Sequence, residues 1–340
     1  MKYNKGITLA GSMLCDVVKS LECYPEIGML ADITDISQSV GGCVPNTAIN
    51  LAKIDRSLPI SAIGMIGDDD YGRYILNQLG KYGIDTSHTK FSNEISTSFS
   101  DVMNLPSGER TFFHFRGANT LFSPEDIDVN ALDCDILHIG YLLLLDRFDE
   151  PDPDYGTAMA RLLHSVQSKG IKTSIDAVSS STLSFEKIIK PSIKYCDYVI
   201  LNEIECCSIW GISPYKNDKP DVTAIKHAMS LTMNEGVKEK VIVHCKAAGF
   251  CLDKSGEFTS VPSLDIPSEQ IKGSVGAGDA FCAASLYGIY NGFSNQEILE
   301  FASAAAACNL FSENSIDGML DKDGIKEIQT KYKRKELNIC

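Results

Sequence analysis

Short, fully apolar runs alternate along the chain with longer segments whose apolar residues have helical spacing. Apolar runs occur at 6–14, 60–67, 135–140, 172–176 and 198–201. Their length and their glycine or acidic boundaries are typical of strands buried on both faces of a sheet. Helical patterns occur around 158–163, over 280–287 and over 297–311. This alternation predicts right-handed βαβ units that build an α/β fold with a doubly wound, mostly parallel sheet flanked by helices.

Two regions have a different pattern, in which apolar and polar residues alternate. They are residues 17–40 and 95–117, and the second contains a Ser107-Gly108 turn between two such runs. Strict alternation is typical of strands with one face in water, and the turn predicts a hairpin. With no repeat or linker in the chain, we expect one domain over 1–340, with a small separate sheet from about 14–40 and 95–117.

Composition narrows the possible functions. The 340 residues include 45 acidic and 31 basic side chains, a formal net charge of −14, which disfavours nucleic acid as a partner. The twelve cysteines contain no C-x-x-C pair, so we expect reduced core residues and not a zinc or disulfide framework. No apolar run reaches the roughly 18 residues of a membrane helix, and we expect a cytoplasmic protein acting on a small molecule.

Gly273-Ser274-Val275-Gly276-Ala277-Gly278-Asp279 directly precedes the helical pattern that begins at Ala280. Amides and the positive dipole end at a helix N-terminus favour an anion, and Asp279 would add a carboxylate beside it. The run has neither the Lys-Ser/Thr ending of a P-loop nor dinucleotide-fingerprint spacing. A plain glycine turn with Asp279 as the N-cap is the alternative.

Three further positions carry polar side chains next to predicted strands. Asp16 follows the first buried run, and Gly41-Gly42 precede a helical pattern that contains Asn46. Asn202 and Glu205 follow the run at 198–201. The second and third of these arrangements are also compatible with ordinary helix capping, in which Asn46 and Asn202 are the caps.

Taken in this order, these motifs resemble the signatures of the ribokinase-like (PfkB) family of sugar and nucleoside kinases. The resemblance covers nearly the whole chain and implies an ATP-dependent kinase that uses Mg²⁺. It implies that the amides of Gly276, Ala277 and Gly278 form an anion hole and that Asp279 is the general base. The same resemblance assigns the remaining site residues: acceptor binding to Asp16, Gly41, Gly42 and Asn46; phosphate contact to Asn202; Mg²⁺ binding through water to Glu205; and nucleotide contact to His244, Lys246, Gly249 and Ser274.

In this family a β-sheet lid closes over the acceptor and often pairs with a second subunit. The resemblance therefore implies a lid from about 14–40 and 95–117, a possible homodimer, and acceptor contacts from Phe99, Phe113 and Arg116. A solvated charge at a sheet edge is the alternative for Arg116. His138 lies in a strand pattern without a ligand partner at metal spacing, and Asp68-Asp69-Asp70 is interpreted as a helix start.

Departures from the family pattern refine the expected substrate. Ala177-Val178-Ser179-Ser180-Ser181 follows Asp176 without the Asn and Arg of relatives that act on anionic acceptors, so we expect a small neutral sugar or polyol. Gly273 stands where the family has a cation-binding aspartate, and we expect little activation by K⁺. A nucleoside kinase is one alternative. A catalytically weak sugar- or nucleotide-binding regulator is the other, suggested by Gly273, His244 and Lys246.

Overall fold

The main sheet has eight strands; the two strand pairings nearest one edge are antiparallel and the other five are parallel. The computed structural model describes residues 5–107, 109–178 and 185–336. In spatial order the strands are β18 (Phe258–Pro262), β17 (Ala248–Asp253), β16 (Lys240–His244), β13 (Tyr198–Asn202), β12 (Lys172–Ala177), β9 (Ile136–Leu142), β1 (Ile7–Gly11) and β4 (Ile60–Ile63). The predicted doubly wound, mostly parallel sheet is confirmed.

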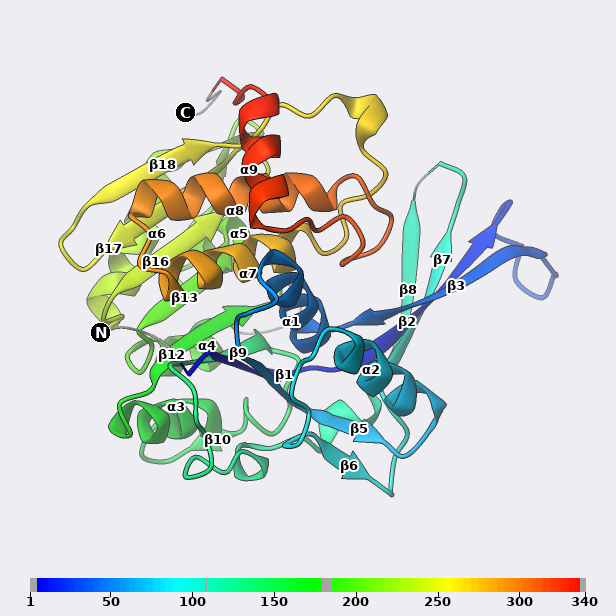
Figure 1. The fold of residues 1–340 in the computed structure, drawn as a ribbon, viewed down its shortest axis with the longest axis horizontal. Coiled ribbons are helices and arrows are strands. Elements are labelled where there is room, and N and C mark those ends of the chain that lie inside the picture. Colours follow the sequence, from blue (N-terminus) through cyan, green and yellow to red (C-terminus); the bar gives the residue numbers. More distant parts are fainter. Residues whose placement is uncertain (1–4, 108, 179–184, 337–340) are drawn as a thin grey trace.

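Helices cover both faces of this sheet (Figure 1). One face carries α1 (Cys43–Ile54), α7 (Ala277–Tyr290), α8 (Asn295–Asn309) and α9 (Lys322–Lys331); the other carries α3 (Ala158–Ser168), α4 (Phe185–Ile193), α5 (Glu203–Ser208) and α6 (Val222–Glu235). Strand side chains alternate between two buried apolar clusters, since Ile200 packs with the first group of helices and Val199 with the second. This double burial explains why the strand sequences are continuously apolar.

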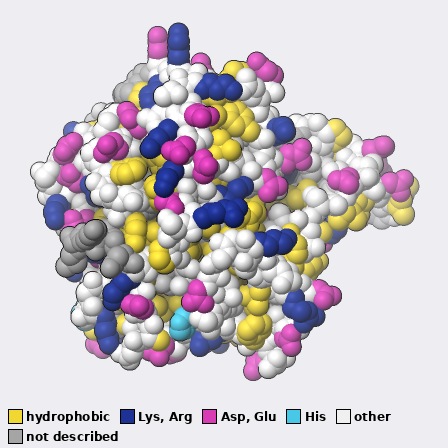
Figure 2. Space-filling view, in the orientation of Figure 1, with side chains coloured by type: hydrophobic (Ala, Val, Ile, Leu, Met, Phe, Trp, Pro, Cys, Tyr) yellow, Lys and Arg dark blue, Asp and Glu magenta, His cyan; other side chains and the backbone are white. Residues whose placement is uncertain are grey.

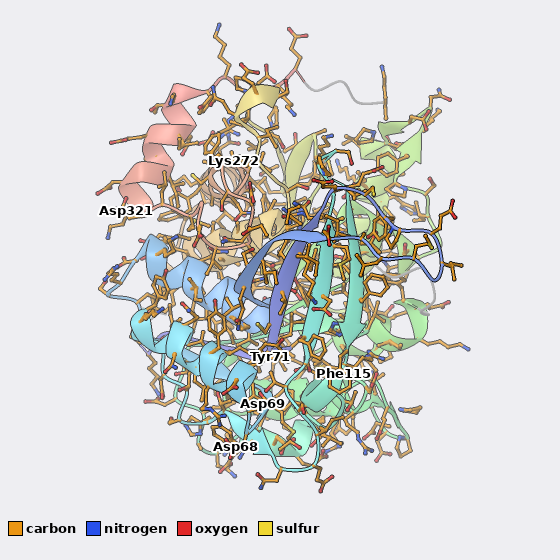
Figure 3. The ribbon with its side chains drawn as sticks, turned by 90° about the vertical axis from the view of Figure 1, so that its right-hand side faces the viewer. Asp68, Asp69, Tyr71, Phe115, Lys272 and Asp321 are labelled. Atoms are coloured by element: carbon orange, nitrogen blue, oxygen red, sulfur yellow. The ribbon has the colours of Figure 1, made fainter. Side chains whose placement is uncertain are left out.

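A second sheet, called here the small sheet, projects from the main body (Figures 1 and 3). Its order is β3 (Ile33–Gly41), β2 (Leu14–Leu21), β7 (Phe99–Asn104) and β8 (Arg110–Phe115). The central pair, β2 and β7, is parallel, whereas the two outer pairs are antiparallel. The predicted turn at Ser107-Gly108 includes Gly108, which lies outside the described residues.

The apolar run at 60–67 forms two strands and not one. Residues after β4 leave the main sheet at Gly64, and β5 (Met65–Gly67) pairs with β6 (Lys90–Ser92). Between them, α2 (Asp70–Lys81) begins at Asp69, whose carboxylate accepts hydrogen bonds from the amides of Gly72 at 2.9 Å and Thr97 at 2.7 Å. Asp69 therefore ties the start of α2 to the segment that leads into β7, as Figure 3 shows at the N-terminal end of the helix.

The remaining strands form two-residue hairpins, β10 (Pro151–Asp152) with β11 (Gly156–Thr157) and β14 (Tyr215–Lys216) with β15 (Lys219–Pro220). Most of the cysteines in the described ranges are buried, and all of those found there are free thiols. Within the same ranges, no helix combines the length and the apolar character needed to cross a bilayer.

Gly42, the N-cap of α1, carries a steric constraint that can be tested. Its φ is +86°, and a Cβ atom there would lie 2.5 Å from the carbonyl oxygen of Ser12. Gly170 has a similar φ of +79° but nothing within 4 Å of its would-be Cβ. We expect Gly170→Ala to lower the free energy of unfolding by about 1 kcal/mol through backbone strain alone. Gly42→Ala adds overpacking and should cost roughly 2 to 5 kcal/mol.

Denaturant unfolding of both variants beside the unmodified protein measures this difference. Equal losses in the two variants would contradict the steric role of Gly42.

Candidate active site

Asp279 lies in the first turn of α7, and its side chain is withdrawn from water. The helix begins at Gly276, whose φ of +79° and contact with Ser315 leave no room for a side chain. Asp279 is 6% exposed. Its carboxylate accepts hydrogen bonds from Nδ2 of Asn46 at 2.9 Å and from the Tyr141 hydroxyl at 3.0 and 3.1 Å. Burial, and then the negative charge of Asp176, raise the pKa of Asp279 to about 7.

Tyr141 is a site residue that the sequence did not reveal. It lies at the carboxyl end of β9 with a φ of +62°, a left-handed conformation that is uncommon for a side chain of this size. Its amide donates to Oδ1 of Asp176 at 2.6 Å, and its hydroxyl reaches Asp279. The only sequence signal was its position after an apolar strand, at the sheet edge where α/β proteins bind ligands.

Asp16 and the two glycines lie together at the start of the small sheet. A Cβ atom on Gly41 would lie 2.4 Å from Oδ2 of Asp16, so only glycine lets this carboxylate lie against the chain. Burial raises the pKa of Asp16 to about 6, and Asp16 in turn raises the pKa of Asp279. Gly42 begins α1, which carries Asn46 to Asp279. The structure thus gathers Asp16, Gly41, Gly42 and Asn46 on one side of the Asp279 carboxylate.

The register of the small sheet separates Phe99 and Phe113 from this group. Asp16 pairs with Ser100, and Ser100 pairs with His114, so these three side chains share one face of the sheet. Phe99 and Phe113 occupy intervening positions and therefore belong to the opposite face. The structure does not bring these two rings to Asp16, because successive residues of a strand direct their side chains to opposite faces of the sheet.

On that opposite face, the ring of Phe99 packs 5.5 Å from Tyr71 and 5.4 Å from Phe115, between centroids. Figure 3 shows Tyr71 at the start of α2 and Phe115 at the end of β8. Phe112, by the same alternation, lies on the face of Asp16 and is 55% exposed. The sequence analysis did not name Phe112 as a site residue.

Arg116 follows β8 and pairs with a loop carboxylate. Its Nη1 atom lies 3.0 Å from Oδ1 of Asp146, and both side chains are 43% exposed. This ion pair holds the guanidinium toward the acidic loop after β9. Within the described ranges, no hydrogen bond or ion pair joins Arg116 to Asp16 or Asp279.

A cavity of about 600 Å³ lies beside the N-terminus of α7. Its lining includes five residues expected on the nucleotide side: Asn202, His244, Lys246, Gly249 and Ser274. The ring of His244 lies 4.8 Å from that of Phe281, and burial lowers the pKa of His244 to about 4. His244 is therefore a neutral ring in this wall, and the basic side chains of the lining are Lys246 and Lys335.

A smaller cavity of about 270 Å³ connects Asp279 with the carboxyl ends of β12 and β13. It is lined by Asp279, Gly276 and Gly278, and also by Asn202 and Glu205. Asn202 caps α5, its Oδ1 accepting from the amide of Glu205 at 2.8 Å, and the Glu205 carboxylate accepts from the backbone amide and Nδ2 of Asn202. Asn202 and Glu205 thus form the helix cap that was the alternative interpretation, and both also line the cavity next to Asp279.

The three expected anion-hole amides lie at this smaller cavity and at the larger one beside it. Gly278 lines both cavities, and no side chain caps the N-terminus of α7 in the described chain. The Ala277 amide also forms a long bond of 3.3 Å with the carbonyl of Ser274. Residues 179–181, used above to infer a neutral acceptor, lie outside the described residues.

Comparisons with known proteins agree with this arrangement. A ribokinase of Arabidopsis thaliana is 25% identical over 324 residues, which cover 95% of this chain and 80% of the relative. A 5-dehydro-2-deoxygluconokinase of Clostridium perfringens is 24% identical over 322 residues, which cover 89% of this chain and 88% of the relative. Both relatives are carbohydrate kinases by name.

Solved structures share the fold. The structure of Arabidopsis thaliana ribokinase complexed with ribose and ATP has a TM-score of 0.77 at 22% identity, covering 97% of this chain and 99% of that one. A nucleoside kinase of Methanocaldococcus jannaschii has a TM-score of 0.73 at 17% identity, covering 97% of this chain and 100% of that one.

The family model described as "pfkB family carbohydrate kinase" matches residues 8–322, nearly the whole chain. This agrees with the resemblance found in the motifs and with the fold. The chain therefore belongs to the pfkB family of carbohydrate kinases, which are phosphotransferases with an alcohol group as acceptor.

Proposed function

We propose that the protein transfers the γ-phosphoryl group of ATP to a hydroxyl group of a small neutral sugar or polyol. The observation that carries this proposal is the buried carboxylate of Asp279, which lies at a helix N-terminus between a nucleotide-sized cavity and the group of Asp16 and Asn46. A base with a pKa near 7 beside an anion-binding turn has the properties needed to deprotonate an alcohol during phosphoryl transfer.

In this mechanism Asp279 accepts the proton of the acceptor hydroxyl as the oxygen attacks phosphorus. The amides of Gly276, Ala277 and Gly278 stabilise the negative charge of the transferring group, an electrostatic effect that is strong where water is excluded. Tyr141 and Asn46 hold the carboxylate in one orientation before the acceptor arrives. The acceptor hydroxyl then displaces one of these two donors or shares the remaining lone pairs.

An unsatisfied polar atom supports the acceptor position. Oδ1 of Asn46 is buried and has no hydrogen-bond partner within the described residues, although Nδ2 of the same side chain bonds to Asp279. Buried polar atoms without partners are rare in folded proteins. A sugar hydroxyl that donates to this oxygen would lie next to the base, with Asp16 available for a second hydroxyl.

The chemistry at the smaller cavity also fits Mg²⁺. Glu205 is 5% exposed, its carboxylate lines the cavity, and the amide of Asn202 lies beside it. Because Mg²⁺ retains several waters and uses few protein carboxylates, Glu205 would hold it through water, near phosphates contacted by Asn202. The bound cation would offset negative charge on the phosphates.

The predicted role of Asp279 can be measured together with the acceptor. We expect one compound in a panel of neutral sugars, polyols and nucleosides to drive ADP formation from Mg-ATP. Asp279→Asn keeps the size of the side chain but removes the base, so turnover should fall at least about 100-fold, since general base catalysis contributes that much. ATP binding measured by calorimetry should remain.

Near-normal turnover of Asp279→Asn would overturn the proposed base. If the panel's acceptor is a nucleoside, the nucleoside alternative holds, and Phe112 becomes the ring to examine. If no compound reacts while ATP or a sugar still binds, the regulator alternative replaces catalysis.

The pH dependence of kcat/KM tests the electrostatics of the base. Asp279 works only when deprotonated, and its pKa is raised to about 7, so the rate should fall about tenfold per pH unit below that value and level off above it. The hydrogen bond from Tyr141 lowers this pKa by stabilising the carboxylate. Tyr141→Phe should therefore move the inflection to higher pH and reduce the rate at pH 7.

Tyr287→Phe is the matched control, because it removes another bond from a tyrosine hydroxyl to an aspartate, 3.2 Å to Asp55, at a distance from the base. Tyr287→Phe should show the same pH dependence of kcat/KM as the unmodified protein. The assigned role of Tyr141 is incorrect if Tyr141→Phe leaves the inflection where it was.

We also propose that the small sheet acts as a lid over the acceptor and pairs with a second copy of the chain. Its outer strands expose Ile33, Ile36, Phe112 and Phe113, each 45 to 61% accessible. Figure 2 shows apolar side chains on the projecting part of the molecule, together with acidic ones. Exposed apolar side chains on a sheet edge favour association.

Sedimentation at micromolar concentration should find a dimer. The double variant Ile36→Lys with Phe113→Lys should be a monomer, because it charges both outer strands of the small sheet. Leu320→Lys, at a 40% exposed position before α9, should remain a dimer. A monomeric unmodified protein would contradict pairing through the small sheet.

A further inference from the structure

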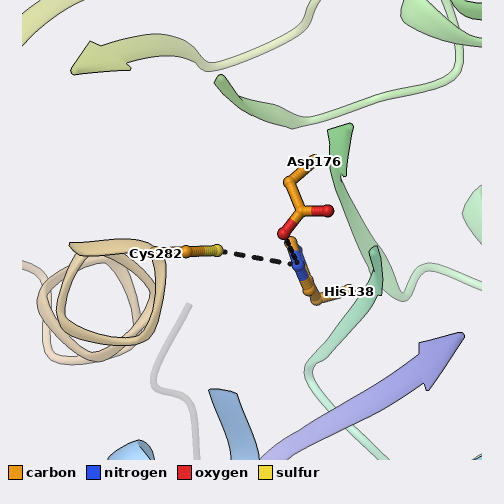
Figure 4. Close-up of side chains that lie close together, drawn as sticks. All are labelled: His138, Asp176 and Cys282. Carbon is orange, nitrogen blue, oxygen red and sulfur yellow. Dashed lines mark hydrogen bonds and ion pairs between the residues drawn. The ribbon is translucent and has the colours of Figure 1, made fainter. Parts of the chain in front are cut away.

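Three ligand-type side chains that are far apart in the sequence converge behind the base. His138 comes from β9, Asp176 from β12 and Cys282 from α7, and Figure 4 shows their side chains directed at one another. They are 2%, 7% and 3% exposed. Nε2 of His138 lies 3.3 Å from Oδ2 of Asp176 and 3.6 Å from Sγ of Cys282, and all three ligand atoms lie within 4.8 Å of one another.

Two of these separations match the edges of a tetrahedral zinc site. Zinc bonds of about 2.05 Å to nitrogen and oxygen and about 2.3 Å to sulfur give N–O edges of about 3.3 Å and N–S edges of about 3.6 Å. The two distances from Nε2 of His138 therefore equal edges expected around one common ion. If Nε2 of His138 carries a proton, it can donate that proton to only one of its two neighbours, Asp176 or Cys282. The two contacts of Nε2 therefore cannot both be hydrogen bonds donated by the ring.

The surroundings of the cluster are those of a metal site. Nδ1 of His138 lies 3.0 Å from Oγ of Ser174, a contact that fixes the ring and leaves Nε2 toward the cluster. The other oxygen of Asp176 accepts from the Tyr141 amide at 2.6 Å, so the carboxylate is oriented as well. Ligand side chains held by outer hydrogen bonds in this way are typical of bound metals.

Charge balance favours a cation here. The buried carboxylate of Asp176 lies close enough to Asp279 that its negative charge raises the pKa of Asp279. Asp16 adds a third carboxyl to the same region. A divalent cation that displaces the thiol proton of Cys282 forms a metal–sulfur bond, releases one proton to solvent, and leaves Asp176, Cys282 and the ion neutral together.

We propose that His138, Asp176 and Cys282 bind a zinc-class divalent cation, with the fourth position open to the smaller cavity. Asp176 and Cys282 line that cavity, which provides the entry path and room for a water ligand. Three protein ligands with an open fourth position form a reactive or exchangeable zinc site, in contrast with a closed structural one. The site differs from that of Mg²⁺, which prefers oxygen ligands and would be held at Glu205.

Co²⁺ is the probe of choice, because a thiolate ligand gives cobalt an intense near-ultraviolet charge-transfer band. The full chain, reduced and freed of metal with a chelator, is titrated with Co²⁺ and then with competing Zn²⁺. We expect one Co²⁺ per chain with a thiolate band, and displacement by Zn²⁺. Cys282→Ser should abolish the band, and His138→Gln should weaken Co²⁺ binding at least roughly tenfold.

Cys308→Ser is the matched control, since Cys308 is an equally buried thiol in α8 outside the cluster. It should retain the band and the affinity. Thermal unfolding of each variant shows that it is folded. Absence of the band in the unmodified protein, or its persistence in folded Cys282→Ser, would overturn the site, and neither result depends on kinase activity.

Discussion

The buried charge of Asp279 is the constraint on which the site depends. A carboxylate removed from water is costly unless hydrogen bonds replace its hydration. Here the replacements come from α1 through Asn46 and from the end of β9 through Tyr141. Tyr141 reaches the carboxylate only in a left-handed backbone conformation that its bond to Asp176 stabilises. The Asp279 carboxylate is thus held by one helix and two strands of the main sheet, in addition to its own helix.

This dependence explains which parts of the site were predictable. Glycine turns and capping residues act within a few positions of the chain, so the loop before α7, the turn at Gly41-Gly42 and the pair Asn202 and Glu205 could be recognised locally. The apolar runs likewise identified the main strands. The family then followed from the order of these motifs, and the match over residues 8–322 confirms it.

What could not be predicted depends on register and on long-range packing. The alternation of apolar and polar residues indicated the strands of the small sheet. Which aromatic rings share a face with Asp16 depends on the pairing of Asp16 with Ser100, and this pairing places Phe99 on the opposite face. His138 had no partner at metal spacing because its neighbours, Asp176 and Cys282, lie 38 and 144 positions away. Tyr141 was missed for a related reason, since nothing near it in the sequence requires a left-handed conformation.

The parallel pairing of β2 with β7 has a consequence for how the molecule is assembled. Antiparallel strands can close through a short turn, whereas parallel neighbours need a long crossover. Here the connecting residues build β3, α1, β4 and α2, so the chain passes through the main body between the two halves of the small sheet. Because the entropic cost of closing that long loop is offset only when α1 and β4 dock, we expect the small sheet to form late in folding. For the same reason it cannot be exchanged between relatives as one continuous insert, and any chimera has to carry both segments.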